Sequence, residues 1–258
     1  MRSYRSLAAC FAALAVLLFC FDASAKGRSG RSPRTEAPAA QKGEVAEPSG
    51  IEPLFPVEAR CFKIASPFGS PTRYDGSKRP SWAPGGGAHG GVDVSLEEGT
   101  PLLALASGTV MDKGEGGTML GIFIWLKHAP EDTGLPYWVF AKYQHLDAMP
   151  ELVVGDRVTA GQKIARSGKT GTTGGHYGAG GYPHLHLTAR KSPDDSFEGS
   201  QLVDPVVLYY DAAKAPASPG PPAGEKQVAI PYVTMDGQIH PPGARLAWPI
   251  ACEALTKK

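Results

Sequence analysis

Histidines and one aspartate recur in three short segments whose spacing is typical of a metal site. The segments read His89-Gly-Gly-Val-Asp93, Tyr143-Gln-His145-Leu146 and His184-Leu-His186. A β-strand points alternate side chains to one face, so residues two or four apart share a face when the chain is extended. A zinc ion that does chemistry keeps three protein ligands and leaves a fourth position for water. The set offers three ligands with imidazoles to spare, which suits catalysis better than a closed structural site.

The elements that must position these side chains are short apolar runs broken by glycine and proline. The 32 glycines and 24 prolines in 258 residues favour turns over long helices. We expect strands over residues 62–64, 101–105, 121–126, 138–143 and 157–164. Residues 128–136 are predicted to form a hairpin loop, with His128 at its edge and without a chemical role. The pattern predicts a mainly β fold with an antiparallel sheet or sandwich core, long loops and few helices.

The N-terminus has the features of a secretory signal over residues 1–25. Arg2 and Arg5 precede an apolar run over residues 7–21, and Ala23-Ser24-Ala25 provides the small-x-small pattern that a signal peptidase cuts after. A single membrane span is the alternative, but this run is shorter than the roughly 20 residues that a bilayer crossing needs. We therefore expect an exported protein of the periplasm or the cell-wall space, with no stable membrane anchor after the signal is removed.

Composition divides the remainder of the chain into four segments. Residues 26–50 are basic and then rich in Pro, Ala, Glu and Gly, as in a flexible linker. A domain is predicted over 51–211, followed by a second linker rich in Pro, Ala and Gly over 212–226. Residues 227–258 are too few for an independent domain, so we expect this C-terminal extension to pack on the core.

Cleavage of the predicted signal would remove Cys10 and Cys20 and leave two cysteines. Cys61 and Cys252 permit one pairing, which would tie the start of the domain to the end of the chain. In an oxidising compartment the bridge is favoured, and two free thiols are the alternative.

Taken in order, the motifs between Ile64 and Tyr210 resemble the lysostaphin-type, or LytM-domain, zinc endopeptidases, which cut peptide bonds in bacterial peptidoglycan. The resemblance rests on the three segments above together with the following runs: Ile64-Ala-Ser-Pro-Phe-Gly69, Glu98-Gly-Thr-Pro101, Ala106-Ser-Gly-Thr-Val110, Val154-Gly-Asp-Arg-Val158 and Gly161-Gln162. It implies a LytM-type core, in which one duplicated hybrid motif builds the sheet, and one zinc ion per chain.

The resemblance also implies the roles of the motif residues. His89, Asp93 and His186 are expected to bind zinc, and His145 and His184 to be the unligated catalytic pair. His176 and His240 have no place in this scheme and are expected to be surface residues.

The sequence departs from the family at three places. Expanded segments at 73–88, with Trp82, and at 172–183, with His176, Tyr177 and Tyr182, both adjoin predicted ligands. We expect them to form walls of a substrate groove, or else mobile loops. At the third place Leu187-Thr188 stands where many members carry Phe-Glu, which should alter contacts around His186 and not ligation.

Two functions follow from the resemblance. The first is a zinc endopeptidase whose partner is the peptide of peptidoglycan, and the second is a non-catalytic activator or regulator of other wall hydrolases, as some relatives without zinc are. The retained ligands and both spare histidines favour the enzyme. With a formal net charge of +1 the chain lacks the basic surface expected of a nucleic-acid partner, and we expect a monomer.

Overall fold

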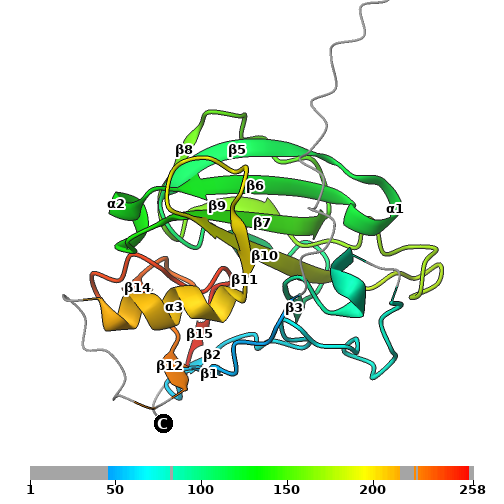
Figure 1. Ribbon diagram of the computed structural model, residues 1–258, viewed down its shortest axis with the longest axis horizontal. Helices are drawn as coiled ribbons and strands as arrows, with labels where there is room; N and C mark the ends of the chain where they lie inside the picture. Colours follow the sequence, from blue (N-terminus) through cyan, green and yellow to red (C-terminus); the bar gives the residue numbers. More distant parts are fainter. Residues whose placement is uncertain (1–45, 82–83, 216–223, 225, 256–258) are drawn as a thin grey trace, which may run out of the picture. The chain divides into compact units, whose positions relative to one another are not determined.

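The computed structural model describes residues 46–258, apart from 82–83, 216–223, 225 and 256–258 (Figure 1). The predicted signal, residues 1–25, lies outside the described residues, as do most of the linker predicted over 26–50 and much of that over 212–226. Across the described ranges, no helix has the length and apolar character that a membrane crossing needs.

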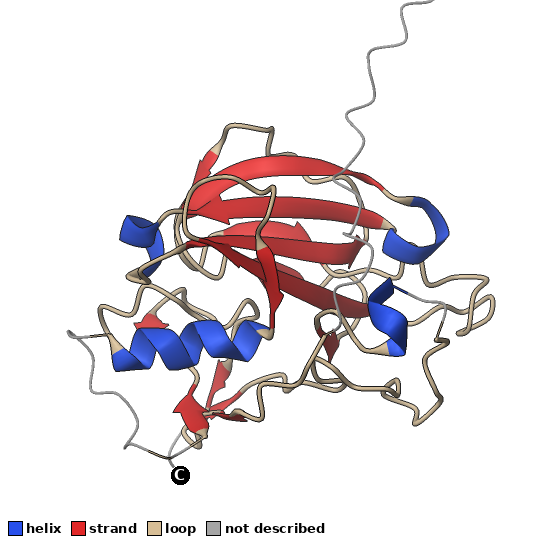
Figure 2. Cartoon of the chain, in the orientation of Figure 1, coloured by secondary structure: helices blue, strands red, loops and turns tan. Residues whose placement is uncertain are grey.

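A seven-stranded sheet dominates the structure (Figure 2). Its path runs β11-β10-β7-β6-β5-β8, and β3 joins it by pairing with β10. Its strands are β3 (Val92–Ser95), β5 (Gly108–Glu115), β6 (Ile122–His128), β7 (Trp138–Leu146), β8 (Arg157–Val158), β10 (His184–Ser192) and β11 (Gln201–Val203). Every pairing in this sheet is antiparallel. The expectation of a mainly β, antiparallel fold is therefore confirmed.

Smaller elements surround the sheet. Four two-stranded sheets pair β1 (Glu52–Leu54) with β12 (Gln227–Ala229), β2 (Ala59–Arg60) with β15 (Glu253–Ala254), β4 (Pro101–Leu103) with β9 (Lys163–Arg166), and β13 (Tyr232–Val233) with β14 (Ile239–His240). Of these, β1 and β12 pair in parallel. The short helical turns are η1 (Pro84–Gly87), α1 (Gly117–Leu120) and α2 (Pro130–Thr133).

The two faces of the large sheet have different environments. Alternate residues on β10 and β7 enter the main core, namely Leu185, Leu187, Ala189, Val139, Ala141 and Tyr143. On the opposite face, Phe123, Trp125 and Phe140 form a second apolar cluster. The period-2 pattern therefore gives β10 and β7 one face in the main core and a second face that carries both this apolar cluster and His186.

Three elements differ from the sequence prediction. The run over 157–164, expected as one strand, is divided between β8 and β9, which belong to different sheets. The strand expected over 62–64 is wrong: these residues form no strand, and the carbonyl of Phe62 accepts a hydrogen bond from the buried Trp248 indole at 3.0 Å. A ten-residue helix, α3 (Pro205–Lys214), was not predicted and runs past residue 211. Asp204 caps it by accepting from the amide of Val206 at 3.0 Å, with Pro205 in the first turn.

The C-terminal residues lie against the start of the described chain. The edge pairings β1–β12 and β2–β15 join the two regions, and Trp248 and Ile250 belong to the main core. Cys61 and Cys252 form a disulfide with a Cα–Cα distance of 4.4 Å, so the predicted pairing is confirmed over the free thiols.

Candidate metal centre and catalytic histidines

The pairing of β3 with β10 brings two of the predicted ligands together. His186 lies directly opposite Asp93 in the antiparallel register. His89 approaches from the turn before β3, across Gly90 and Gly91. A Cβ on Gly91 would lie 2.5 Å from the carbonyl oxygen of Leu187 and 2.7 Å from His186 Nε2. Only glycine allows β3 to lie this close to the His186 ring.

Ligand atoms of His89, Asp93 and His186 converge on one point. Asp93 Oδ1 lies 3.0 Å from His89 Nε2 and 2.8 Å from His186 Nδ1, and the two nitrogens are 3.1 Å apart. The outer nitrogen of His89, Nδ1, is 3.0 Å from the carbonyl oxygen of Pro67, which can only accept. That contact fixes the tautomer, so the inner nitrogen of His89 presents a lone pair.

Asp93 is a buried carboxylate held on both oxygens. Its Oδ2 accepts a hydrogen bond from Arg79 at 3.2 Å, and its side chain is 4% exposed. Burial alone would raise the pKa of Asp93, but the close contacts and the charges of His186 and His89 outweigh burial and hold that pKa well below its usual range. Asp93 therefore remains an anion.

His145 reaches the site through a β-bulge in β7. Leu146 pairs with Ile122 and Gln144 with Phe123, so His145 is an extra residue between the two pairs. Its φ of 62° is in the left-handed region, where side chains other than glycine are uncommon. In a regular strand His145 would point to the core face, opposite to Gln144. The bulge redirects its ring to within 4.4 Å of the His184 ring, centroid to centroid.

His184 is fixed by the residue two positions before it. Its Nδ1 donates to the carbonyl of Tyr182 at 2.7 Å, and the Tyr182 ring stacks on the imidazole at 4.3 Å. The Nδ1 of His145 likewise donates to the carbonyl of Thr170 at 2.7 Å. Both imidazoles therefore keep Nε2 as the acceptor, and Nε2 of His184 lies 3.6 Å from Asp93 Oδ1.

Burial keeps these imidazoles neutral. Burial and the neighbouring charges of His184 and His186 lower the pKa of His145 to about 3. Burial also lowers the pKa of His184. At neutral pH each ring is a base with a vacant Nε2.

The donor set fits one zinc ion. Two imidazole nitrogens and a carboxylate oxygen are ligands that zinc accepts in open catalytic sites. Three atoms that carry lone pairs lie within 3.1 Å of one another, which is repulsive unless a cation or protons lie between them. His89, Asp93 and His186 also form a group whose ligand atoms all lie within 4.8 Å.

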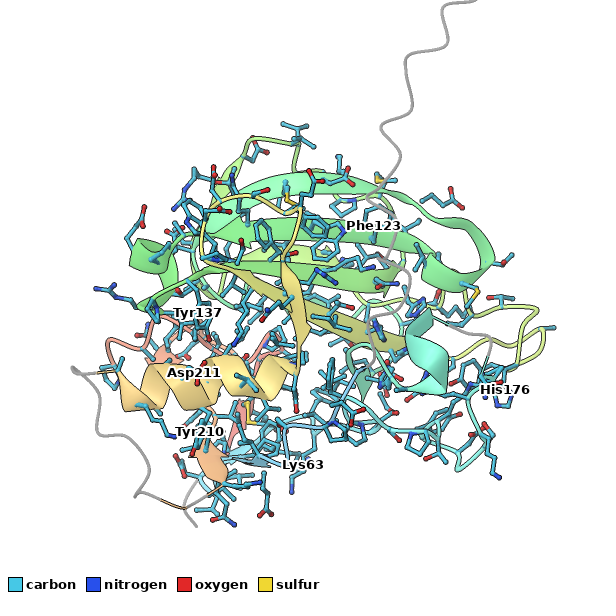
Figure 3. The ribbon with its side chains drawn as sticks, in the orientation of Figure 1. Lys63, Phe123, Tyr137, His176, Tyr210 and Asp211 are labelled. Carbon is cyan, nitrogen blue, oxygen red and sulfur yellow. A yellow bond between two sulfur atoms is a disulfide. The ribbon has the colours of Figure 1, made fainter. Side chains whose placement is uncertain are left out.

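The two expanded loops contact each other beside this site. Tyr74 stacks on Tyr182 at 4.0 Å and on Tyr177 at 5.8 Å. His176, labelled in Figure 3, places Nε2 2.9 Å from Asp75 Oδ2 and 3.0 Å from Ser77 Oγ. The loops therefore join into one wall that ends on His184, and we call Tyr74, Tyr177, Tyr182 and His176 the loop clasp. Trp82 lies outside the described residues.

Sequence reasoning missed three contributors, namely Arg79, Tyr182 as a partner of His184, and the bulge at His145. Arg79 lies ten residues before the first ligand, where no motif spacing marks it. Thr188, at the third departure from the family, places its Oγ1 3.1 Å from His186 Nε2. His240, expected at the surface, stacks on Tyr232. It belongs to the β13–β14 sheet and not to the sheet that carries His184 and His186.

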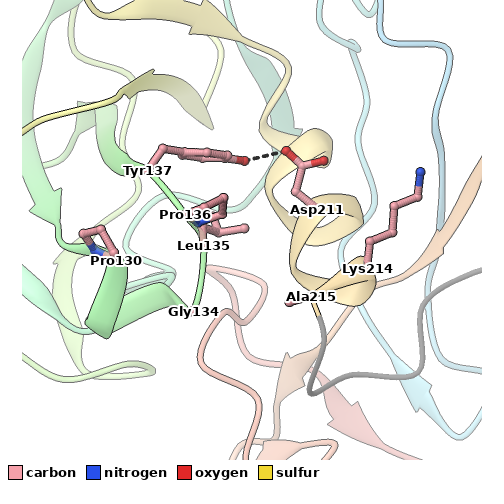
Figure 4. A pocket seen from close by; sticks show the side chains of 8 residues that line it. All are labelled: Pro130, Gly134, Leu135, Pro136, Tyr137, Asp211, Lys214 and Ala215. Atoms are coloured by element: carbon pink, nitrogen blue, oxygen red, sulfur yellow. Dashed lines mark hydrogen bonds between the residues drawn. The ribbon is translucent and has the colours of Figure 1, made fainter.

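A surface pocket of about 460 Å³ lies elsewhere (Figure 4). It is lined by residues 130 and 134–137 and by Asp211, Lys214 and Ala215 of α3. The Tyr137 hydroxyl donates to Asp211 Oδ2 across it at 2.6 Å. None of the predicted ligands or catalytic histidines lines this pocket, so it is separate from the candidate centre.

Comparison with known proteins identifies a family over the same residues. The model described as Peptidase family M23 matches residues 87–205. Over 150 residues the chain is 33% identical to lysostaphin of Staphylococcus staphylolyticus, covering 55% of this chain and 27% of the relative. It is also 33% identical to glycyl-glycine endopeptidase ALE-1 of Staphylococcus capitis, covering 49% of this chain and 30% of that relative. The chain therefore spans less than a third of the length of these curated relatives.

Among solved structures, the catalytic domain of lysostaphin from Staphylococcus simulans is 31% identical in sequence. The match covers 57% of this chain and 91% of that domain, with a TM-score of 0.41. Over residues 87–205 the chain therefore carries a Peptidase family M23 domain, homologous to lysostaphin and glycyl-glycine endopeptidase ALE-1.

Proposed function

We propose that this protein is an exported zinc metalloendopeptidase that hydrolyses peptide bonds in the stems or cross-links of peptidoglycan. The observation that carries the proposal is the convergence of His89, Asp93 and His186 beside two neutral imidazoles whose Nε2 atoms are acceptors. A regulator without catalysis would need neither the ligands nor the two bases.

In this proposal His89, Asp93 and His186 would hold one zinc ion with the atoms that converge, namely Nε2, Oδ1 and Nδ1. When bound, the ion would lower the pKa of a water toward about 7 and polarise a peptide carbonyl. The negative charge of Asp93 offsets part of the metal charge, and the carbonyl of Pro67 holds the His89 ring in the ligating tautomer.

His145 and His184 move the protons of the reaction. Each imidazole is neutral and can accept a proton at Nε2 from the attacking water. The protonated ring can then stabilise the oxyanion or donate to the leaving amine. The carbonyls of Thr170 and Tyr182 keep both rings in orientation through this cycle.

The proposal is tested by digestion of purified sacculi with the zinc-loaded protein, with released fragments read by mass spectrometry. We expect new peptide termini, which also identify the bond that is cut. His184→Ala should keep bound zinc and release nothing, whereas Asp93→Ala should lose both zinc and activity. His240→Gln, remote from the centre, is the control and should behave as the unchanged protein.

The absence of cleavage from sacculi of several chemotypes, with zinc confirmed bound, would contradict the endopeptidase. It would favour the regulator, which then predicts that the chain stimulates a separate wall hydrolase. Undiminished activity of His184→Ala would show that the catalytic pair is misassigned.

A further inference from the structure

Lys142 lies on the face of the sheet that carries the candidate metal centre. In the β7–β10 register, Gln144 is opposite His186 and Lys142 is opposite Thr188. Paired residues share a face, and residues two apart along a strand do as well. Lys142 is therefore a diagonal neighbour of His186, about 7–8 Å away by sheet geometry. Thr188 lies between them and contacts His186 Nε2 through its hydroxyl.

No acidic side chain in the described ranges pairs with Lys142. Its Nζ lies over the Trp125 ring, 5.1 Å from the centroid. Lys127 offers a comparison on the same face of the sheet. It also lies over a tryptophan ring, that of Trp138, but it forms an ion pair with Asp195 at 3.5 Å. Of these two lysines, only Lys127 has an acidic partner among the described residues.

The surroundings of Lys142 make a charged ammonium without an acidic partner unfavourable in free energy. Lys142 is partly buried among Trp125 and Thr188, which are 5% and 7% exposed. Arg190, the next residue after Thr188 on the same face of β10, adds a positive charge close by. Burial and the Arg190 charge lower the pKa of Lys142 to about 8, so most of the amine remains protonated at pH 7. A partly buried ammonium is stabilised chiefly by an anionic partner.

We propose that Lys142 binds a carboxylate of the substrate peptide and makes the enzyme select peptides with a free carboxylate over amidated ones. The inference rests on the proposed peptidase function and names a specificity residue for it. An extended peptide advances about 3.4 Å per residue, so the recognised carboxylate lies within about two or three residues of the scissile bond. The aromatic ring of Trp125 beneath Nζ excludes water and strengthens the ion pair.

The experiment compares synthetic stem peptides that differ only in whether their carboxylates are free or amidated. For the zinc-loaded protein we expect a KM about tenfold or more lower for the free form, since hydrogen bonds between charged groups discriminate by that order. Lys142→Met should remove the preference by raising KM for the free peptide, with little change in kcat. Lys142→Arg should retain part of the preference, and Lys127→Met should retain all of it.

A second readout does not depend on turnover. Calorimetric binding of the same two peptides to the zinc-loaded His184→Ala variant, with and without Lys142→Met, should show the same preference and its loss. If the preference appears in binding while the unchanged protein cleaves nothing, the peptidase proposal fails and the carboxylate site stands. Equal KM values for free and amidated peptides, or a preference that survives in Lys142→Met, overturn the role of Lys142.

Discussion

Arg79 binds the oxygen of Asp93 that points away from His186. The guanidinium lies 3.2 Å from Asp93 Oδ2, while Oδ1 faces the two histidine nitrogens. The same guanidinium donates to Ser66 Oγ at 3.0 Å, and Arg79 Nε donates to the carbonyl of Thr72 at 3.3 Å. Arg79 is thus anchored to the backbone while it orients the carboxylate.

Arg79→Met should weaken zinc binding by about tenfold or more, since partners that orient a ligating side chain have effects of that order. The charge of Arg79 also repels a cation, but the loss of a fixed, hydrogen-bonded carboxylate should outweigh this repulsion. Competition with a chelating dye measures the change. Arg73→Met is the control from the same loop, because Arg73 bonds to Ser77 and Lys78 and not to Asp93. Tighter zinc binding in Arg79→Met would show that repulsion dominates.

His145→Asn should leave fold and zinc intact and abolish turnover. Asparagine accepts the left-handed conformation of residue 145 better than most residues, and its amide can replace the Nδ1 donor to the Thr170 carbonyl. It lacks a base at the position of Nε2. Zinc content and the near-ultraviolet circular dichroism should match those of the unchanged protein, with activity on sacculi reduced at least about a hundredfold. Substantial residual turnover would place the essential base on His184 alone.

Gly91→Ala should remove zinc binding, whereas Gly90→Ala should not. The new methyl group at 91 would lie 2.5 Å from the Leu187 carbonyl oxygen, so β3 must move away from β10. At 90 the nearest atom is 3.8 Å away, an ordinary van der Waals contact. Metal analysis and thermal unfolding of the two variants measure the difference. Equal zinc content would mean that β3 and β10 can separate without loss of the site.

The free energy of unfolding should decrease as the pH is lowered from about 6.5 to about 4, because His128 is buried in its neutral form. This ring is fully buried, its Nδ1 donates to the Ser107 carbonyl at 2.7 Å, and its Nε2 has no hydrogen-bond partner among the described residues. Burial lowers its pKa to about 4, with the charges of Asp132 and Arg157 nearby in opposition. The unfolded chain, with an ordinary histidine pKa near 6.5, binds the proton first as pH falls, so acid favours unfolding. The loss amounts to about 2–3 kcal/mol by pH 4.

Urea unfolding at pH 7 and pH 4.5 measures the contribution of His128 to the free energy of unfolding. His128→Asn keeps a donor for the Ser107 carbonyl and cannot titrate, so its stability should depend less on pH even if it is lower overall. The test is the change in the free energy of unfolding between the two pH values, compared for the unchanged protein and the variant. An unchanged difference in the variant would assign the acid sensitivity to other groups.

The sequence was sufficient where local chemistry determines the outcome. Spacing within His184-Leu-His186 and the short apolar runs predicted strands and a shared face, and the register of β3 against β10 agrees with them. The position of His145 could not be predicted, because alternation places it in the core and only the bulge opposite Ile122 and Phe123 redirects it. The loop clasp depends on contacts between segments about a hundred residues apart, which no local pattern records. Arg79 is only 14 positions from Asp93, but no motif spacing marks that pair. Helix α3 is marked in the sequence chiefly by its N-cap Asp204 and by Pro205, residue types that are equally common in turns.

The bridge between Cys61 and Cys252 changes what a proteolytic cut can do to this molecule. The two cysteines are 191 positions apart and enclose every predicted ligand and both candidate catalytic histidines. A single cleavage anywhere inside that span leaves two fragments that remain covalently joined, and the edge pairings β1–β12 and β2–β15 keep their ends together. Such a nicked chain would migrate as one species on a non-reducing gel and as two after reduction. A first cut within this span would therefore leave both halves of the molecule in one covalent unit.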